Sequence, residues 1–417
     1  MADRFPLEVV RGAAFQVRFL ICCGVVAAAQ IGKALITIPL IRQEFSLSVG
    51  ASGLIVATMA TLGATTGIVA GALVKRIRPS RALVAGMTAI GLANVLGATA
   101  QSETALLIAR LIEGVGFFGA VLAIPSMLTL IAKPRDRDFT LAIWSAYLPA
   151  GITLMLLLGS LAAFVGWRVF WLGSGATALA FALAACFVVP RVQAPDSPSP
   201  SQLLADMRAV LDEPKCLLLA GAFFLFTCQM FSMMFALPLL LTSADASAVG
   251  RAALLSAGVL AVSTVGHFLG GALLRAGAPA WANIAAAFSV YAVCSAILYS
   301  APLSPAATVL IAGLALGIGG LAPAALYASA PKAAPNAGSV PVAIGLLQQA
   351  SNLGQFAGPI ALGFWVQSLG WRNATTLVTP AALIGLVLAL CIRRATSRDP
   401  GVKTARPDAQ APQVARD

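Results

Sequence analysis

Charge is scarce in this sequence. Only 10% of its 417 residues are Asp, Glu, Lys or Arg, whereas 59% are hydrophobic. A water-soluble domain has about 25% charged residues, so this chain has too little charged surface to cover a globule of its size in water. The composition therefore excludes a soluble fold and predicts that most of the chain lies in a lipid bilayer.

The sequence also lacks the short alternating segments of a transmembrane β-barrel. Its apolar residues form long runs instead, and a membrane-spanning helix needs about 20 of them. We predict an all-α integral membrane protein with twelve spans, the first of which stays uncleaved because its apolar run is too long for a signal peptide. The expected spans are residues 19–41, 51–74, 82–100, 105–132, 140–164, 169–189, 216–241, 252–274, 282–300, 306–330, 341–367 and 374–392.

Basic residues are distributed unevenly between the two sides of the expected bilayer. Most of the 27 lysines and arginines lie before the first span, in alternate loops and in the C-terminal tail. The other loops contain only Arg42, Arg168, Arg251 and Arg372. The positive-inside rule then places both termini in the cytoplasm. The net charge of +12 is expected to face anionic lipid headgroups, and we expect no nucleic-acid partner.

One long loop divides the expected spans into two sets of six. It contains SQLLADMRAVLDEP from Ser201, whose apolar residues share one helical face, so we predict a short amphipathic helix on the membrane surface. The predicted organisation is an N-terminal six-helix bundle (1–189), a cytoplasmic linker (190–215), a C-terminal six-helix bundle (216–392) and a disordered cytoplasmic tail (393–417).

The two sets of spans resemble each other in sequence. Internal duplication of this kind is typical of secondary transporters, whose substrate site lies between the two halves. Three matches occur in the same order, at offsets of 200, 203 and 204 residues: GALV at Gly71 with GALL at Gly271, IARLIEGVG at Ile108 with IAGLALGIG at Ile311, and GWR at Gly166 with GWR at Gly370.

Four ionisable residues fall well inside the predicted spans: Lys33, Arg110, Glu113 and His267. A charge at the centre of a membrane helix costs about 2.5–3.5 kcal/mol on insertion scales, so such residues usually face a partner or a cavity. We expect Glu113 to pair with Lys33 or with Arg110. Two cations against one carboxylate would leave a positive pocket suited to a small anion. The alternative is a closed ion-pair network that only fixes two helices.

Two of these residues are candidates for coupling transport to protons. Glu113 is the only carboxylate deep in a span. His267 is the only histidine and could titrate near neutral pH. Its neighbours Gly266, Gly270 and Gly271 favour a packed helix contact instead.

Neutral polar residues in the spans complete the candidate site. An amide in hydrocarbon needs a hydrogen-bond partner, so these side chains are expected either to line a substrate cavity or to bond between helices. The candidate substrate-binding residues are Gln30, Lys33, Arg110, Gln229, Gln348, Asn352 and Gln355.

Neither the seven cysteines nor any other residues show the spacing of a metal site, a disulfide framework or a catalytic constellation. We therefore expect no cofactor, no bound metal and no enzymatic activity. The expected partners are a small-molecule substrate, membrane lipid and protons, and we expect a monomer.

In these features the sequence resembles the major facilitator superfamily. GALVKRIRPSRAL from Gly71 is similar to the family's signature loop between the second and third spans, although Lys75 replaces its usual aspartate. ARLIEGVG from residue 109 resembles the family's motif in the fourth span, and GQFAGP from residue 354 resembles its Gly-Pro motif. The resemblance implies a gating role for the loop residues Gly71, Lys75, Arg76, Arg78 and Arg81.

A narrower resemblance links LIEGVGFFG, WSAYLPAG and GWRVFW to bacterial members grouped with cyanate and nitroimidazole transporters. It implies a protein of the bacterial inner membrane whose two bundles rock around a central site. We predict a secondary transporter of a small polar or anionic organic solute, with proton coupling left open. The alternatives are an efflux carrier for a drug, siderophore or other amphipathic product, and a membrane sensor that transports nothing.

Overall fold

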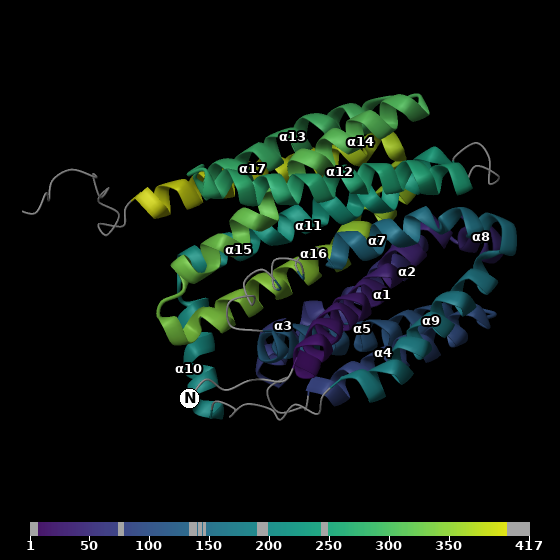
Figure 1. The fold of residues 1–417 in the computed structure, drawn as a ribbon. Coiled ribbons are helices and arrows are strands. Elements are labelled where there is room, and N and C mark those ends of the chain that lie inside the picture. Colours follow the sequence, from purple (N-terminus) through teal and green to yellow (C-terminus); the bar gives the residue numbers. More distant parts are fainter. Residues whose placement is uncertain are drawn as a thin grey trace, which may run out of the picture.

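The structure is a computed structural model. It describes the chain except for residues 1–6, 74–78, 133–139, 141–143, 145–146, 190–198, 243–248 and 398–417. Every regular element within the described residues is a helix (Figure 1). Ten of the described helical segments are long and apolar enough to cross a membrane by length and composition.

The first half of the chain supplies six spans, some of them built from two helices. The 3-10 turn at Thr58–Ala60 joins α2 to α3 within one span, and α7 and α8 follow each other within another. The helices are α1 (Leu7–Phe45), α2 (Val49–Ala57), α3 (Thr61–Leu73), α4 (Pro79–Ala98), α5 (Glu103–Ile131), α7 (Tyr147–Leu157), α8 (Gly159–Val165) and α9 (Trp167–Val188).

The second half repeats this arrangement after the short helix α10 (Pro200–Leu211), and α14 and α15 form one span that is interrupted at Gly320. The prediction of twelve spans in two bundles of six is confirmed. The helices are α11 (Pro214–Leu241), α12 (Val249–Arg275), α13 (Ala280–Ser300), α14 (Pro305–Gly319), α15 (Leu321–Ala333), α16 (Val340–Leu369) and α17 (Thr375–Ser397).

Two spans do not pass the simple test of length and hydropathy. Helix α16 carries five amide side chains, which lower its mean hydropathy: Gln348, Gln349, Asn352, Gln355 and Gln367. The span made of α7 and α8 is divided into short pieces. In both cases the surrounding helices, rather than the apolar content alone, place the segment within the bundle.

The two bundles pack in the same way. In the first, α4 contacts α5 and α9, and α1 contacts α7; in the second, α13 contacts α14 and α17, and α11 contacts α16. Gly166 and Gly370, the first residues of the two GWR matches, have φ angles of 80° and 81°. Glycine adopts this left-handed conformation without the steric cost of a Cβ, so the duplicated motif preserves one tight turn before α9 and before α17.

A further repeat links α1 with α11. Gln30 stands nine residues before Pro39 in α1, and Gln229 stands nine residues before Pro238 in α11. Each amide points at the last span of its own bundle: Ser174 donates to Gln30 Oε1 over 2.9 Å, and Gln229 donates to the carbonyl of Val378 over 2.6 Å. Gln30 and Gln229 therefore occupy equivalent positions in the two halves.

The halves meet where α16 crosses α2 and α3, and where α12 crosses α7 and α8 (Figure 1). At the first crossing, a Cβ added to Gly53 would overlap the carbonyl oxygen of Pro359. Near the end of α16, Gln367 accepts a hydrogen bond of 3.1 Å from the Gly50 backbone N–H. Glycine thus allows the two backbones to approach closely, as is common between membrane helices.

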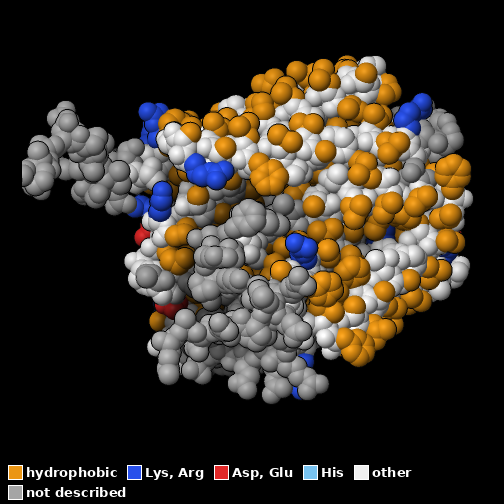
Figure 2. Space-filling model, viewed as in Figure 1, with side chains coloured by type: hydrophobic (Ala, Val, Ile, Leu, Met, Phe, Trp, Pro, Cys, Tyr) orange, Lys and Arg blue, Asp and Glu red, His pale blue; other side chains and the backbone are white. Residues whose placement is uncertain are grey.

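The membrane-facing surface is apolar. Figure 2 shows hydrophobic side chains over most of the visible face of the helices, with lysine and arginine side chains in small groups. Phe164 and Phe187 are 90% and 82% exposed. A soluble monomer rarely exposes a continuous apolar surface of this kind, whereas a bilayer solvates it.

Helix α1 is longer than predicted, and the short helix predicted in the loop between the two bundles is present. Helix α1 begins at Leu7 and has 39 residues, because the basic segment before the predicted span continues the same helix. The predicted helix after Ser201 is present as α10, whose N-terminus is closed by a reciprocal capping box between Ser199 and Gln202.

Candidate functional site

A buried ionic network fills the centre of the first bundle. Glu113 of α5 is bound on both carboxylate oxygens: Lys33 Nζ of α1 lies 2.8 Å from Oε1, and Arg110 Nη1 lies 2.6 Å from Oε2. Asn94 of α4 accepts a hydrogen bond of 2.5 Å from Lys33 Nζ. All four residues are fully buried. The sequence offered Lys33 or Arg110 as the partner of Glu113, and the structure pairs the carboxylate with both.

The remaining donors of Arg110 reach backbone groups of two other helices. Its Nε donates to the carbonyl of Ile55 and its Nη2 to that of Val56, over 3.2 and 3.5 Å. Its Nη1 also donates to the carbonyl of Gln30 over 3.3 Å, and its Nη2 lies 3.4 Å from the sulfur of Met59. The guanidinium thereby joins α5 to α1 and α2, so the charge is satisfied without solvent.

Gln30 extends the network towards α9. Its Oε1 accepts hydrogen bonds from Asn94 and Ser174, over 3.1 and 2.9 Å, while its Nε2 donates to the carbonyl of Val26. Lys33 Nζ also lies 3.8 Å from the ring centroid of Trp171, a cation–π geometry. Four helices of one bundle are therefore joined through polar side chains in its interior.

The network carries a surplus positive charge. Lys33 and Arg110 are cations and Glu113 is their only carboxylate partner among the described residues. A buried ion pair persists when hydrogen bonds satisfy its remaining donors and acceptors, and here each charged group has at least two partners. Among the residues that the structure describes, one positive charge therefore has no counter-ion inside a low-dielectric bundle, where its field is weakly screened.

The described residues of the second bundle carry no charges at the positions equivalent to Lys33, Arg110 and Glu113. At the offset of 199 that relates Gln30 to Gln229, Lys33 corresponds to Ser232; at the offset of 203, Arg110 and Glu113 correspond to Gly313 and Leu316. Gln229 Oε1 is buried and has no hydrogen-bond partner within the described part of the chain, whereas Gln30 Oε1 accepts from Asn94. Among the described residues, the buried ionic network therefore occurs only in the first of two otherwise similar bundles.

The amides of α16 lie at the interface between the bundles. Gln348 accepts a hydrogen bond of 2.6 Å from the Tyr327 hydroxyl, and Asn352 donates to the Gln348 carbonyl over 2.9 Å. Gln355 donates a hydrogen bond of 3.5 Å from its Nε2 to Asn352 Oδ1, and it lines a small cavity of about 10 Å³. The other walls of this cavity come from both bundles: Ile31, Val56, Ala57, Met59, Ala60, Phe117 and Phe231.

The ionic network and the α16 amides form two separate groups. Met59 is their nearest link, because its sulfur contacts Arg110 and its side chain lines the same cavity as Gln355. Gln229 bonds within its own bundle. His267 lies elsewhere, with Nδ1 2.8 Å from the Ser263 carbonyl, against α14–α15 at Gly320. The predicted site residues are therefore not all brought together.

Three residues of the network were not predicted. Asn94, Ser174 and Trp171 lie on helices that the sequence treated as ordinary apolar spans. Asn94 offered a signal, since an amide within residues 82–100 needs a partner in hydrocarbon. The predicted gating residues Lys75, Arg76 and Arg78 lie outside the described residues. Gly71 falls near the end of α3, and Arg81 is exposed near the start of α4.

The family model of the Major Facilitator Superfamily matches residues 20–316 and 284–415. The chain belongs to this superfamily. Over 130 residues it is 37% identical to the major facilitator superfamily multidrug transporter mfsC of Aspergillus fumigatus. This match covers 30% of this chain and 24% of that protein. Over 140 residues it is 33% identical to the uncharacterized MFS-type transporter EfpA of Mycobacterium tuberculosis, which covers 32% and 26%. The chain thus aligns with about a quarter of each relative.

Solved structures of superfamily members share the fold over nearly the whole chain. A bacterial homolog of the human lysosomal transporter Spinster, in an inward-facing and occupied conformation, has a TM-score of 0.79 at 17% identity and covers 91% of this chain and 97% of that one. A mutant of the nucleoside transporter NupG has a TM-score of 0.75 at 12% identity and covers 91% and 99%. At such identities the likeness concerns the fold alone.

Proposed function

We propose that this superfamily member is a secondary carrier for a small organic solute with an anionic or polar group. It would act by alternating access in a bacterial cytoplasmic membrane, with both termini in the cytoplasm. The observation that supports it is the surplus buried cation of the Lys33–Glu113–Arg110 network. An uncompensated charge in a membrane protein commonly marks a substrate or ion pathway, and a carrier has no need of a catalytic constellation.

The surplus charge would act on the solute mainly through its field. Met59 separates Arg110 from the central cavity between the bundles, so a solute in that cavity lies close to the network without displacing its hydrogen bonds. Low-dielectric surroundings strengthen such an interaction. At about 10 Å³ the cavity has room for about one water molecule. It would have to widen as the bundles move before its apolar walls and the Gln355 amide hold the rest of the solute. Rocking of the two bundles about this cavity would expose the solute to each side in turn.

Lys33→Met tests the anionic part of this proposal. The substitution removes the surplus charge but leaves the Arg110–Glu113 pair. A thermal-shift screen of purified protein against organic anions and their neutral analogues identifies a ligand, whose affinity and transport are then measured in proteoliposomes. We expect the variant to bind the anion about tenfold more weakly, which corresponds to about 1.4 kcal/mol, with little change for neutral compounds.

The matched control for this experiment is Lys332→Met, because Lys332 is exposed in the last turn of α15. It makes the same chemical change far from the network. Equal affinities of the wild type and the Lys33 variant for every anion that binds would contradict the anionic solute class.

Proton coupling is a second part of the proposal, and Glu113 is its carboxylate. A packing role for His267 is supported by its ring nitrogen, which lies 2.8 Å from the Ser263 carbonyl of its own helix, and by its backbone, which packs against Gly320. We expect His267→Gln to retain solute accumulation driven by an imposed pH gradient in proteoliposomes. Loss of that accumulation, with exchange of labelled solute intact, would move the coupling site to α12.

A second candidate function is efflux of an amphipathic compound. One relative is named a multidrug transporter, and an apolar groove with a polar floor opens on the membrane face of the first bundle. A strain without the protein would then become sensitive to a lipophilic compound. Loss of growth on a solute, with unchanged sensitivity to such compounds, would favour uptake instead.

A further inference from the structure

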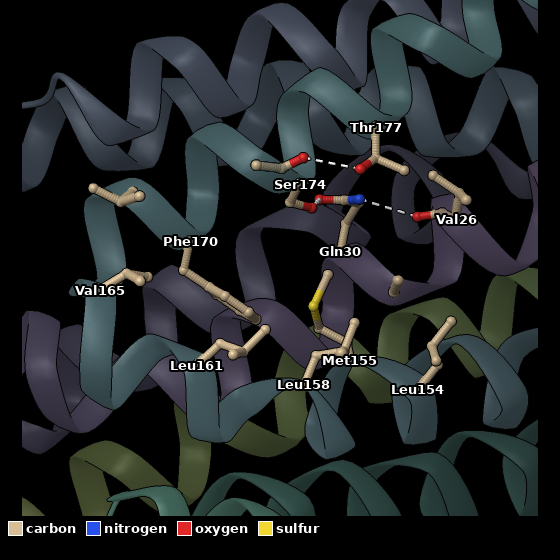
Figure 3. Close-up of a pocket in the computed structure, with 13 residues that line it drawn as sticks. Val26, Gln30, Leu154, Met155, Leu158, Leu161, Val165, Phe170, Ser174 and Thr177 are labelled. Carbon is tan, nitrogen blue, oxygen red and sulfur yellow. Dashed lines mark hydrogen bonds between the residues drawn. The ribbon is translucent and has the colours of Figure 1, made fainter.

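A groove of about 330 Å³ opens between α1, α7, α8 and α9 on the outer surface of the first bundle (Figure 3). Its walls are apolar and accessible from the membrane: Leu154, Leu161 and Val169 are 45%, 49% and 55% exposed. It does not belong to the interface between the bundles, where the central cavity lies. The groove therefore faces the hydrocarbon of the bilayer.

The floor of the groove is polar. Figure 3 shows the Gln30 amide reaching into the space between α1 and α9, beside Ser174 and Thr177. Gln30 is only 1% exposed. Its Nε2 donates to the Val26 carbonyl over 3.0 Å, and within the described part of the chain this nitrogen has no other acceptor. Ser174 bonds to Gln30 Oε1 over 2.9 Å. Hydrogen-bonding groups thus line the inner end of a groove that is otherwise apolar.

The groove has the dimensions of one leaflet. Its wall on α7 and α8 runs from Leu154 to Val165, which corresponds to roughly 16 Å at a rise of about 1.5 Å per residue. Half of a hydrocarbon core of about 30 Å is about 15 Å. An elongated apolar molecule lying along the groove would therefore extend from the interface beside Val165 to Gln30 near the middle of the membrane.

Polarity decides which molecule is favoured in the groove. Lipid chains are as apolar as its leucines and valines, so an acyl chain gains no hydrophobic free energy by moving into it. A hydroxyl or carbonyl dissolved in hydrocarbon lacks a hydrogen-bond partner, and Gln30 and Ser174 supply one. An apolar molecule with one such group is therefore favoured over a lipid chain of the same length.

We propose that this groove is a lateral binding site that admits, from the bilayer, elongated apolar molecules carrying one neutral hydrogen-bonding group, and that Gln30 recognises this group. Binding would be communicated to the ionic network, because Gln30 Oε1 also accepts from Asn94, which holds Lys33. The assignment deepens the second candidate function, efflux of an amphipathic compound, by naming its substrate class, and it rests on transport activity only for its consequence in transport.

Photoaffinity labelling in lipid nanodiscs tests the binding directly. The probe is a twelve-carbon alcohol that carries a diazirine, and the matched probe is the same chain without the hydroxyl. We expect the alcohol to label residues 154–173 about tenfold more strongly than the alkane. Leu161→Trp should reduce this labelling to background by filling the groove. The control is Leu183→Trp, which changes an exposed leucine of α9 outside the groove and should leave the labelling unchanged.

Ser174→Ala removes one polar group of the floor without touching a charged residue, and we expect it to reduce the preference for the alcohol at least threefold. Equal labelling by alcohol and alkane would overturn the proposal and identify the groove as a site for lipid chains only. Labelling that survives Leu161→Trp would overturn it as well. Selective labelling by a protein that transports nothing would retain the groove and refute the carrier function, so the two failures are distinguishable.

Discussion

Glu113→Gln is expected to lower the free energy of unfolding by about 3–5 kcal/mol, the usual cost of removing one partner from a buried ion pair. The substitution leaves Lys33 and Arg110 as two buried cations, with no carboxylate partner among the described residues. Neither cation can reach water, because both side chains are fully buried. Unfolding of the purified protein in detergent measures the change.

Two comparisons make this result specific to the network. Lys33→Met removes a cation and leaves a neutral pair, so we expect a smaller loss of about 1–3 kcal/mol from the polar groups it leaves unpaired. Glu44→Gln makes the same chemical change at a carboxylate that is 43% exposed and lies 2.6 Å from Arg168. A surface pair contributes about 0–1 kcal/mol. If Glu113→Gln and Glu44→Gln were equally stable, the network would not stabilise the bundle.

Gly53→Leu is expected to reduce transport more than tenfold while both bundles remain folded. The added side chain would overlap the carbonyl oxygen of Pro359, a backbone atom of the opposite bundle that cannot rotate away. The close contact of α2 with α16 then cannot form, and a carrier that alternates between two arrangements loses one of them. Transport of the labelled ligand from the thermal-shift screen, together with size-exclusion behaviour and thermal stability, measures the effect.

Gly258→Leu is the matched control for the interface variant. Gly258 lies in α12, and no atom lies within 4 Å of a Cβ built on it. The same substitution there should leave transport nearly unchanged. Normal transport by the Gly53→Leu variant would show that α2 and α16 do not need this close contact during the transport cycle. Loss of folded protein in the variant would place the effect on assembly of the bundles instead.

Most of the fold followed from local properties of the chain. Long apolar runs predicted the spans, and the amphipathic pattern after Ser201 predicted α10. The break at Gly320 within one span was not predicted, because a glycine in an apolar run is compatible with a continuous helix. It becomes a break where Gly320 packs against the α12 backbone at Ser263 and Gly266, and this packing is visible only in three dimensions.

The site was predictable in part. The rarity of intramembrane charge singled out Lys33, Arg110 and Glu113, and the structure places them in contact. Trp171 and Ser174 were missed because their role depends on how α9 is rotated about its axis. The equivalence of Gln30 and Gln229 was present in the sequence, as a shared spacing to the helix proline, but it became meaningful only once both amides were seen to face the last span of their bundle.

The sequence by itself determined that this protein is a helical membrane protein, how many spans it has and which charges are buried. Transfer into lipid depends on the composition of a single segment of about 20 residues, so each span can be predicted from its own segment of the sequence. Tertiary structure alone decided that Glu113 binds both cations, that the surplus charge is enclosed and that a groove leads from the lipid to Gln30. These features depend on the rotation and spacing of helices far apart in the chain, which packing between them sets.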